Sequence, residues 1–544
     1  GQGTFERARL TGSDLGKELW AFIPKNALPY LKYITDPDYC HIYTVDLSSF
    51  IFDASIGAPG SGDISNNTKT VNDWRTILIG GMRFGGACRG TTTACPDVSG
   101  DGSKDCVNTP VDVSGSSIGY SSYFALDITD NLANPANPPV LLWEFTDSQL
   151  GFATTGPAVV KVVPDATLNG KWFAVFGSGP TGPIITSDLQ FMGRSDQNMR
   201  LFIFDLKTGP GANNANVTVK DTAITYAFAG SMVNTTYDHR LGQGGGAITM
   251  EDEAIYIGYT KREGAGTVPN PYKWTNGGVG RLLIKGDQNP INWEWTTLID
   301  NIGPVTTSVT HLYSKIYKNT WLFFATGRYY FELDSTTEPD ITKATDDTTG
   351  QRRLFGIKEP CVDVDGTLNW TLPACTTVNF SDLTNVTSLA SAPSEATANA
   401  SSFKGWYINL DLCTDSSGAT VSCTGSFVKY WTERTITDPV ASPSSGAVFY
   451  TTYKPYNDEC GIGGKTHIWT MKYSTGGEVA SLLKGKALLQ VSTAAIEEIS
   501  LSSAFTEKEG RRTTGMEGVP PTAQGLVIIG QPKPVKRVIH IMER

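Results

Sequence analysis

The stretch that decides the fold runs from Lys404 to Gly477. It begins KGWYINLDLC and continues, from Glu433, as ERTITDPVASPSSGAVFYTTYKPYNDECGIGGKTHIWTMKYSTGG. Two runs rich in β-branched and aromatic residues, Ala447–Thr452 and His467–Tyr473, flank a loop of glycine, proline, asparagine and aspartate. This composition predicts a strand, a loop and a second strand.

The same arrangement recurs along most of the chain, and we expect about six copies of strand, glycine-containing turn and strand. Many copies are closed by a further strand that carries tryptophan or leucine. The expected strands are Trp74–Gly81, Tyr123–Ile128 and Val140–Phe145, then Trp172–Gly177 and Leu201–Leu206, then Ala254–Gly258, Arg281–Lys285 and Trp293–Leu298, then Trp321–Ala325, Tyr329–Leu333 and Leu354–Lys358, then Ala447–Thr452 and His467–Tyr473, and finally Gly525–Gly530 and Val538–Met542.

Small antiparallel sheets in sequence predict an all-β protein and, more specifically, a β-propeller of about seven irregular blades. A lone four-stranded sheet buries too little apolar surface, whereas stacking each sheet on the next covers both of its faces. We therefore expect residues 1–544 to form a single propeller domain. An array of β-sandwiches is the alternative.

The copies are spaced unevenly, and the excess residues lie in polar insertions. The 57 glycines and 29 prolines of the chain also indicate many turns. We expect the insertions to be surface loops that decorate the propeller. The two largest lie near residues 83–119 and 359–403, and the others lie at 207–246, 260–279 and 335–351.

The two ends of the chain read as parts of incomplete copies. Glu18–Ile23 resembles a closing strand without its opening strands, and Val538–Met542 resembles a middle strand. Because an open strand edge invites strand addition, we expect the gap near Glu18–Ile23 to be filled. Val538–Met542 would fill it, or a separate polypeptide such as a cleaved N-terminal part of the same precursor.

After residue 23 we expect a helical turn or two at Ala27–Tyr33 and strands at Ile42–Val45 and Phe50–Asp53.

Charge and hydropathy exclude some classes of partner. The formal net charge of −10 argues against free nucleic acid and favours calcium or a basic protein surface. No run of about 18 apolar residues occurs, so we expect no transmembrane segment. The five histidines lack metal-ligand spacing, and no GxSxG, HExxH or Walker motif is present. We therefore expect that the protein is not an enzyme.

The nine cysteines include three close pairs, each of which brackets a polar loop. We expect disulfides within these pairs, which are Cys95/Cys106, Cys361/Cys375 and Cys413/Cys423. Disulfides persist in oxidising compartments, so this pattern favours an exported protein over one with scattered reduced thiols. Cys40, Cys88 and Cys460 are left without an expected partner.

The best candidate for a chemical site is a calcium loop in the segment DVSGDGSKDCVN, residues 97–108. Its oxygen-bearing residues fall at positions 1, 3, 5, 7 and 9 of an EF-hand-type loop, and Gly102 falls at the sharp turn. Asn108 replaces the usual bidentate glutamate at position 12, so affinity for Ca²⁺ should be weaker; a solvated turn is the alternative. The expected ligands are Asp97, Ser99, Asp101, Ser103 and Asp105.

A shorter acidic segment within the Cys361–Cys375 loop reads DVDGTLN. It places Asp363, Asp365 and Asn369 close together. The segment is too short for a full calcium loop, and we expect a plain turn there.

Ten motifs, taken in order, carry a resemblance to a known family. They are GKELWAFIP, LPYLKYITDPDYCHIYTVD, DWRTILIGGMRFGG, YFALDITD, VLLWEF, FKGWYINL, ERTITDPV, GAVFYTTYKP, CGIGGKTHIW and the tail EGRRTTG…GVPP…VKRVIHIMER. Together they resemble the C-terminal β-propeller of the PilC/PilY family of type IV pilus tip-associated adhesins. The resemblance covers nearly the whole chain.

The resemblance implies a protein exported through the periplasm and outer membrane to the cell surface and the pilus tip. Such a protein caps the pilus through minor pilins, promotes pilus extension, and attaches to abiotic or host-cell surfaces. The family's Asp-rich calcium loop is not carried over, because the matching place holds only Glu251, Asp252 and Glu253 without the required spacing. The alternatives are a structural partner of another extracellular filament and a quinoprotein-type propeller enzyme. The active site of such an enzyme often includes a disulfide between adjacent cysteines, and this sequence contains no adjacent cysteines.

Overall fold

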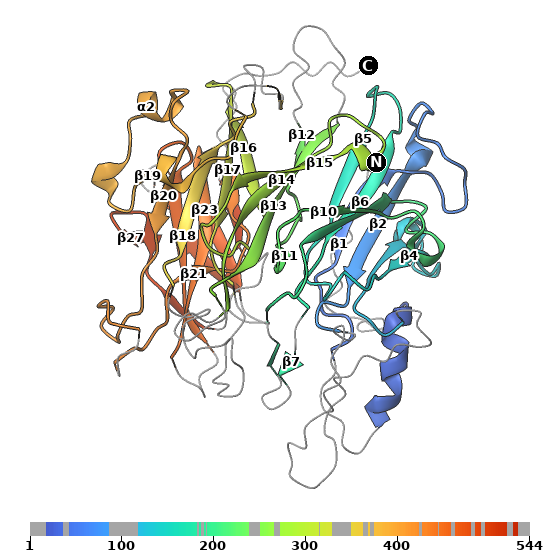
Figure 1. The fold of residues 1–544 in the computed structure, drawn as a ribbon, viewed down its shortest axis with the longest axis horizontal. Coiled ribbons are helices and arrows are strands. Elements are labelled where there is room, and N and C mark those ends of the chain that lie inside the picture. The colour runs from blue at the N-terminus through green and yellow to red at the C-terminus, as the bar shows by residue number, and fades with distance from the viewer. Residues whose placement is uncertain are drawn as a thin grey trace.

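Short antiparallel sheets follow one another along the chain, from the blue segments to the red segments of Figure 1. The structure is a computed structural model. It describes residues 18–35, 43–85, 118–181, 184–185, 190–191, 193–238, 251–265, 272–314, 316–328, 350–362, 368–369, 371, 375–423, 427–443, 445–457, 463–479, 483, 485–490, 496–518 and 526–530.

The first three sheets are built from consecutive strands that pair mainly with their neighbours in the sequence. The first sheet contains β1 (Phe50–Ser55), β2 (Trp74–Gly81), β3 (Tyr123–Asp127) and β4 (Val140–Phe145). The second contains β5 (Ala158–Val162), β6 (Lys171–Gly177), β9 (Arg200–Asp205) and β10 (Thr218–Asp221). The third contains β11 (Ala227–Ala229), β12 (Thr236–Asp238), β13 (Asp252–Glu263), β14 (Lys273–Leu283) and β15 (Glu294–Ile299).

The next three sheets continue the series. The fourth contains β16 (Thr310–Ser314), β17 (Asn319–Ala325), β18 (Arg353–Lys358), β20 (Gly405–Asn409) and β19 (Thr384–Asn385). The fifth contains β21 (Arg434–Thr435), β22 (Val440–Ser442), β23 (Ala447–Pro455), β24 (Gly464–Lys472), β27 (Phe505–Glu507), β28 (Arg512–Thr513) and β29 (Met516–Gly518). The sixth contains β25 (Gly485–Gln490), β26 (Ile496–Ser500) and β30 (Leu526–Gly530).

Within the described residues helices are few and short and strands predominate, so the all-β fold class predicted from the sequence is confirmed. The small pair β7 (Ile184–Ile185) and β8 (Gln190–Phe191) stands apart from the six sheets. The helices are η1 (Lys25–Thr35), η2 (Val71–Asp73), α1 (Thr129–Ala133), η3 (Ala212–Asn214), η4 (Pro290–Asn292), η5 (Phe380–Asp382), η6 (Leu389–Ser391) and α2 (Glu395–Asn399). Among the described helices, none is long and apolar enough to cross a membrane.

Each pair of consecutive sheets shares an apolar core. For example, Val160 of the second sheet and Ile257 of the third belong to one core, and Phe449 of the fifth and Leu489 of the sixth belong to another. Because both faces of a middle strand are covered, β17 is buried at every position. In the described part of the chain, these cores join the sheets in series, and none of them joins the sixth sheet to the first.

Close packing across the strands explains the recurring glycines of the sequence pattern. Gly80 lies opposite Phe124 in the first sheet, and Gly356 lies opposite Trp406 in the fourth. A Cβ atom at Gly80 would lie 2.4 Å from the Phe124 ring, and one at Gly356 would lie 2.4 Å from the Trp406 indole. The missing side chain therefore provides the space in which the aromatic ring of the next strand lies.

The expected strands near the N-terminus are partly wrong. Residues 18–24 form no strand, because Trp20 and Phe22 pack instead on an apolar face of the first sheet. The rings of Phe22 and Phe124 lie 4.8 Å apart. Residues 43–45 form no strand either, whereas the strand expected at Phe50–Asp53 and the helical turns expected at Ala27–Tyr33 are confirmed by β1 and η1.

Two expected surface loops are also wrong, since they contain strands of the sheets. Residues 207–246 include β10, β11 and β12, and residues 260–279 include the ends of β13 and β14. Edge strands such as β10 are short and alternate in exposure, so their polar residues resemble those of a loop. Residues 359–403 contribute buried side chains, including Val378 and Ala398, to the interior.

Some expectations fall outside the described residues. These are the strands Tyr329–Leu333 and Val538–Met542, most of the 83–119 insertion, and nearly all of residues 335–351. The proposed filling of a gap by Val538–Met542 therefore stays a prediction. In the sixth sheet, β30 pairs with β25, which the sequence pattern did not indicate.

Candidate functional site

Five connections between neighbouring main strands define what we call the loop edge. They join the second main strand of a sheet to the third, and Figure 1 shows β7, which belongs to one of them, at the lower end of the view. Two of these connections touch, because Arg328 Nη1 donates a hydrogen bond to the Gly193 carbonyl. The connections comprise residues 82–122, 178–199, 264–272, 326–352 and 456–463.

The predicted calcium loop belongs to the first connection of the loop edge. All five expected ligands, Asp97, Ser99, Asp101, Ser103 and Asp105, lie outside the described residues, so the calcium site stays a prediction. Within the described ranges, no group of three or more histidine, cysteine, aspartate or glutamate side chains is arranged to hold a metal ion.

The second acidic segment is described in part. Asn369 Oδ1 accepts hydrogen bonds from the backbone N–H of Thr371 at 3.1 Å and from its hydroxyl at 2.6 Å. This is how asparagine closes a turn. Asp363 and Asp365 lie outside the described residues.

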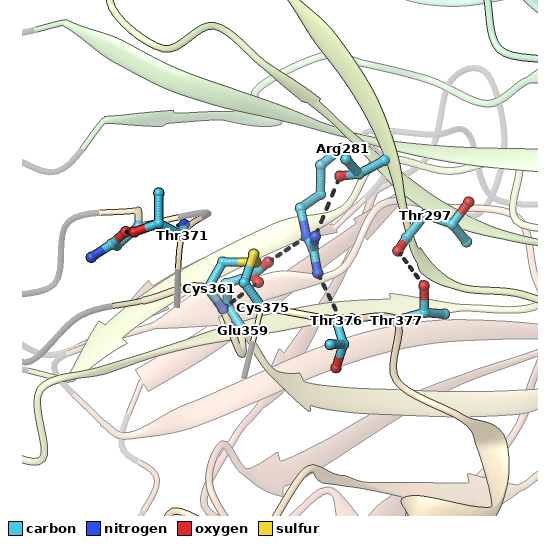
Figure 2. Close-up of a disulfide and its surroundings, with 10 residues drawn as sticks. Arg281, Thr297, Glu359, Cys361, Thr371, Cys375, Thr376 and Thr377 are labelled. Atoms are coloured by element: carbon cyan, nitrogen blue, oxygen red, sulfur yellow. Dashed lines mark hydrogen bonds and ion pairs between the residues drawn. A yellow bond between two sulfur atoms is a disulfide. The ribbon is translucent and has the colours of Figure 1, made fainter. Parts of the chain in front are cut away.

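The disulfide Cys361–Cys375 is confirmed, and Figure 2 shows it beside a buried ion pair between Arg281 and Glu359. Arg281 comes from β14 of the third sheet, and Glu359 follows β18 of the fourth sheet. Their side chains are 2% and 0% exposed, and Arg281 Nε donates to Glu359 Oε2 at 3.0 Å. The other carboxylate oxygen accepts from the Cys361 N–H at 2.9 Å. The ion pair therefore joins the start of the 359–403 insertion to the neighbouring sheet.

The rest of this insertion is tied to the third sheet by further hydrogen bonds. The Val378 N–H donates to the Leu298 carbonyl at 2.7 Å, and the Thr377 hydroxyl donates to the Thr297 carbonyl at 3.1 Å. Figure 2 shows the Thr377 contact below β15. The described part of the insertion, largely exposed, thus also bridges two sheets.

The disulfide Cys413–Cys423 is confirmed as well. The loop it closes is organised by Asp415, whose carboxylate accepts from the hydroxyl and N–H of Ser417 and from the Ala419 N–H. These bonds hold the pKa of Asp415 below its usual value. Cys95 and Cys106 lie outside the described residues, as do Cys40, Cys88 and Cys460.

The fifth sheet contains a buried network of charges that the sequence did not reveal. Glu433 has a fully buried side chain, and its Oε2 accepts from Arg512 Nη1 at 2.7 Å. Its Oε1 accepts from the Trp469 indole N–H at 2.8 Å and from the Thr452 hydroxyl. Arg512 Nη1 also lies 2.8 Å from Asp411 Oδ2. The network joins residues that are 101 positions apart in the chain.

Electrostatics keep these carboxylates ionised. Burial is the largest single influence on the pKa of Glu433 and raises it, but the Arg512 guanidinium and smaller contributions such as the Thr452 hydrogen bond together place this pKa below its usual value. The pKa of Asp411 is lowered in the same way, with a contribution from Lys508. Glu433 and Arg512 occur in the motifs ERTITDPV and EGRRTTG, but nothing in a single sequence shows that these motifs meet.

Two of the three acids in the run Glu251, Asp252 and Glu253 hold neighbouring elements together. Asp252 Oδ2 accepts from the Lys161 N–H of the second sheet at 2.7 Å, and Glu253 Oε2 accepts from the Leu368 N–H at 2.8 Å. Burial raises the pKa of Asp252 to about 7. Asp252 and Glu253 therefore link β13 to the second sheet and to the segment at Leu368.

Two of the five histidines lie in the described residues: His467 is buried in β24, and His311 is half-buried in β16. Burial lowers the pKa of His311 to about 4 and also lowers the pKa of His467. Both rings are therefore neutral near pH 7. His41, His239 and His540 lie outside the described residues.

Comparison with known proteins gives a limited likeness. No family model matches the chain. Two curated proteins of Xylella fastidiosa (strain Temecula1), each named type IV pilus biogenesis factor PilY1 homolog, are similar to parts of it. One is 27% identical over 203 residues, which are 37% of this chain and 11% of that protein. The other is 26% identical over 169 residues, which are 30% of this chain and 8% of that protein.

The matched regions therefore span about a tenth of the length of these relatives. Among solved structures, a mutant apocarotenoid oxygenase of Synechocystis aligns with 90% of this chain and 65% of its own, at 7% identity and a TM-score of 0.29. No argument about fold or activity follows from a score this low.

Proposed function

We propose that this chain is a propeller-forming region of a type IV pilus biogenesis factor of the PilC/PilY type. The observation that carries the proposal is its likeness to two proteins named PilY1 homologs. In this proposal the protein is exported to the cell surface, lies at the pilus tip and binds minor pilins. It has no enzymatic activity of its own and attaches the pilus to abiotic or host-cell surfaces.

The disulfides support the exported location. The Cys361–Cys375 disulfide closes a short loop after β18, and the Cys413–Cys423 disulfide closes a short loop between β20 and β21. Such cross-links persist outside the reducing cytosol. The buried sheet cores and the ion pair between Arg281 and Glu359 support a rigid scaffold, which suits a protein that transmits force at the end of a filament.

The propeller and the calcium loop are parts of the same proposal. Six sheets stacked in series are consistent with blades arranged around an axis. Calcium would be held at the loop edge by Asp97 and Asp101 with neighbouring oxygens. Elemental analysis of the purified protein should find Ca²⁺, and a variant with both aspartates replaced by alanine should lose it; a calcium-free wild type would refute the site.

Binding to minor pilins tests the proposed role. The purified chain, immobilised on a sensor surface, should bind the soluble domains of the source organism's minor pilins and should not bind its major pilin. A matched chain with reduced and alkylated cysteines controls for the folded state. Equal, weak binding to all pilins would contradict the role at the tip.

A further inference from the structure

A polar cavity of about 400 Å³ opens at the loop edge between the third and fourth sheets. It lies at the ends of β13 and β14, beside the turn after β15 and the residues that lead into β18. Its volume lies in the range of cavities that take small ligands, but its lining is unusual for such sites because Ile302 is the one large apolar residue among the described lining residues. The chemistry of the polar lining therefore decides what it could bind.

Two cationic side chains of the lining have no carboxylate partner among the described residues. Lys273 at the start of β14 makes no ion pair there, and neither does Arg353 at the start of β18. The Arg353 guanidinium is held in place, since its Nε donates to Asn409 Oδ1 at 2.9 Å and its Cζ lies 4.8 Å from the Phe380 ring centre. Burial without a counter-charge lowers the pKa of Arg353. The cavity thus offers the held Arg353 guanidinium and the Lys273 ammonium to an anionic group.

Uncharged groups of the lining suit hydroxyl groups. Asn276 Nδ2 donates to Asn301 Oδ1 at 3.0 Å, which fixes the orientation of the Asn301 amide. The N–H₂ group of Asn301 is then available as a donor. Glu263 accepts from the Thr275 hydroxyl, and its second oxygen provides an acceptor. The Gln351 N–H₂ group donates to the Leu410 and Arg352 carbonyls. The side-chain oxygen of Gln351 takes no part in these bonds and can accept a hydrogen bond.

We propose that this cavity binds an acidic sugar residue, with its carboxylate at Lys273 and Arg353 and its hydroxyls at Asn301 and Glu263. A simple inorganic anion would use only the cations and would leave the amide and carboxylate groups of the lining without partners. An apolar peptide side chain would find only Ile302. A molecule that carries both a carboxylate and several hydroxyls uses every kind of group in the lining. This inference does not depend on the proposed role at the pilus, because the isolated chain would show it.

The test is calorimetric titration of the purified chain with digalacturonate. Its fully methyl-esterified form, which lacks the charge, and inorganic phosphate, which lacks the hydroxyls, serve as comparison ligands. We expect saturable binding of digalacturonate and at least about tenfold weaker binding of the other two, because the ester lacks the charge that pairs with the cations and phosphate lacks the hydroxyls that pair with the amide and carboxylate groups. No saturable binding, or equal binding of phosphate, would overturn the proposal.

Variants locate the binding site. Lys273→Gln and Asn301→Gly should each weaken digalacturonate binding by about tenfold; glycine tolerates the left-handed backbone of Asn301, whose φ is 60°. Lys318→Gln and Asn213→Gly are the matched controls, since both are exposed residues with left-handed φ away from the cavity. Equal losses in the controls, or unchanged binding in the two cavity variants, would show that the sugar binds elsewhere. Thermal unfolding of all four variants verifies that each one is folded.

Discussion

Glu433 is the residue whose side chain most directly joins distant parts of the fifth sheet. Removing one partner of a buried ion pair leaves the other charge uncompensated, which costs about 3–5 kcal/mol. We therefore expect Glu433→Gln to lower the free energy of unfolding by about 3 kcal/mol, because Arg512 and the Trp469 indole lose a charged acceptor. Urea denaturation at pH 7 measures the change.

Glu507→Gln is the matched control, because Glu507 also contacts Arg512 at 2.7 Å but its side chain is 34% exposed. We expect a loss of less than about 1 kcal/mol there. The folded pKa of Glu433 is lowered, so the stability it contributes is present above its unfolded pKa and is lost as pH falls through the folded value. The difference between wild type and Glu433→Gln should shrink in acid. Equal losses in both variants at pH 7 would contradict the network.

Asp252 should have the opposite pH dependence. Its folded pKa of about 7 lies above its usual value because burial disfavours the charge, and Asp238 and Glu251 add to the shift. Ionisation therefore destabilises the fold as pH rises from about 4 to about 7. Lys161, whose pKa burial lowers to about 8, only partly offsets this cost.

Asp252→Asn cannot ionise, so its stability relative to wild type should increase between pH 4 and pH 8, by about 1 kcal/mol or more at the upper end. Thermal unfolding across this pH range measures it. Asp53→Asn serves as the control, since Asp53 is exposed on β1. A constant difference between Asp252→Asn and wild type at all pH values would be the contradicting result.

At the scale of the element, the 359–403 insertion is the clearest case of a bridge between sheets. The Cys361–Cys375 disulfide closes 14 residues, and a loop of about that length contributes roughly 3 kcal/mol through the entropy of the unfolded chain. We expect the Cys361→Ser/Cys375→Ser variant to lose about 2–3 kcal/mol of stability and to exchange the Val378 amide faster. Calorimetry and hydrogen exchange measure these effects.

The Cys413→Ser/Cys423→Ser variant is the comparison, because its loop of 10 residues lies apart from the third sheet. It should leave the exchange of the Val378 amide unchanged. Faster exchange of Val378 in both variants would mean that the insertion is not held by its own disulfide. Non-reducing peptide mapping of the same samples also tests the Cys95–Cys106 pair.

The strands were the most predictable elements. Runs such as Trp172–Gly177 and Trp321–Ala325 are apolar at nearly every position because sheets cover both of their faces, so composition alone identifies β6 and β17. Edge strands such as β10 were not predicted, because one of their faces is exposed to water. Glu18–Ile23 has the composition of a strand but packs its aromatic side chains on a sheet. This packing is a tertiary contact, which local strand propensity does not predict.

The side-chain contacts were less predictable than the strands. Two disulfides could be predicted because their cysteines are close in the sequence. The contacts of Glu433 with Arg512 and of Arg281 with Glu359 join residues about 80 positions apart, 79 and 78 respectively. Such pairings depend on how the sheets stack, which no local pattern specifies.

At the scale of the whole molecule, the proposed propeller predicts a compact particle. A compact globule of this length has a radius of gyration of about 24 Å, and a closed ring of blades should approach that value. Small-angle scattering of the monomer measures it. An elongated series of sheets would give a clearly larger radius and would contradict the proposed propeller.

The location of the protein tests the central claim most directly. Pili sheared from the source organism and purified should contain this chain in small amounts relative to the major pilin, and gold-labelled antibodies should mark it at filament ends. A strain that lacks the gene controls for the antibodies. Its absence from purified pili, with the protein recovered from the cytoplasm instead, would contradict the account.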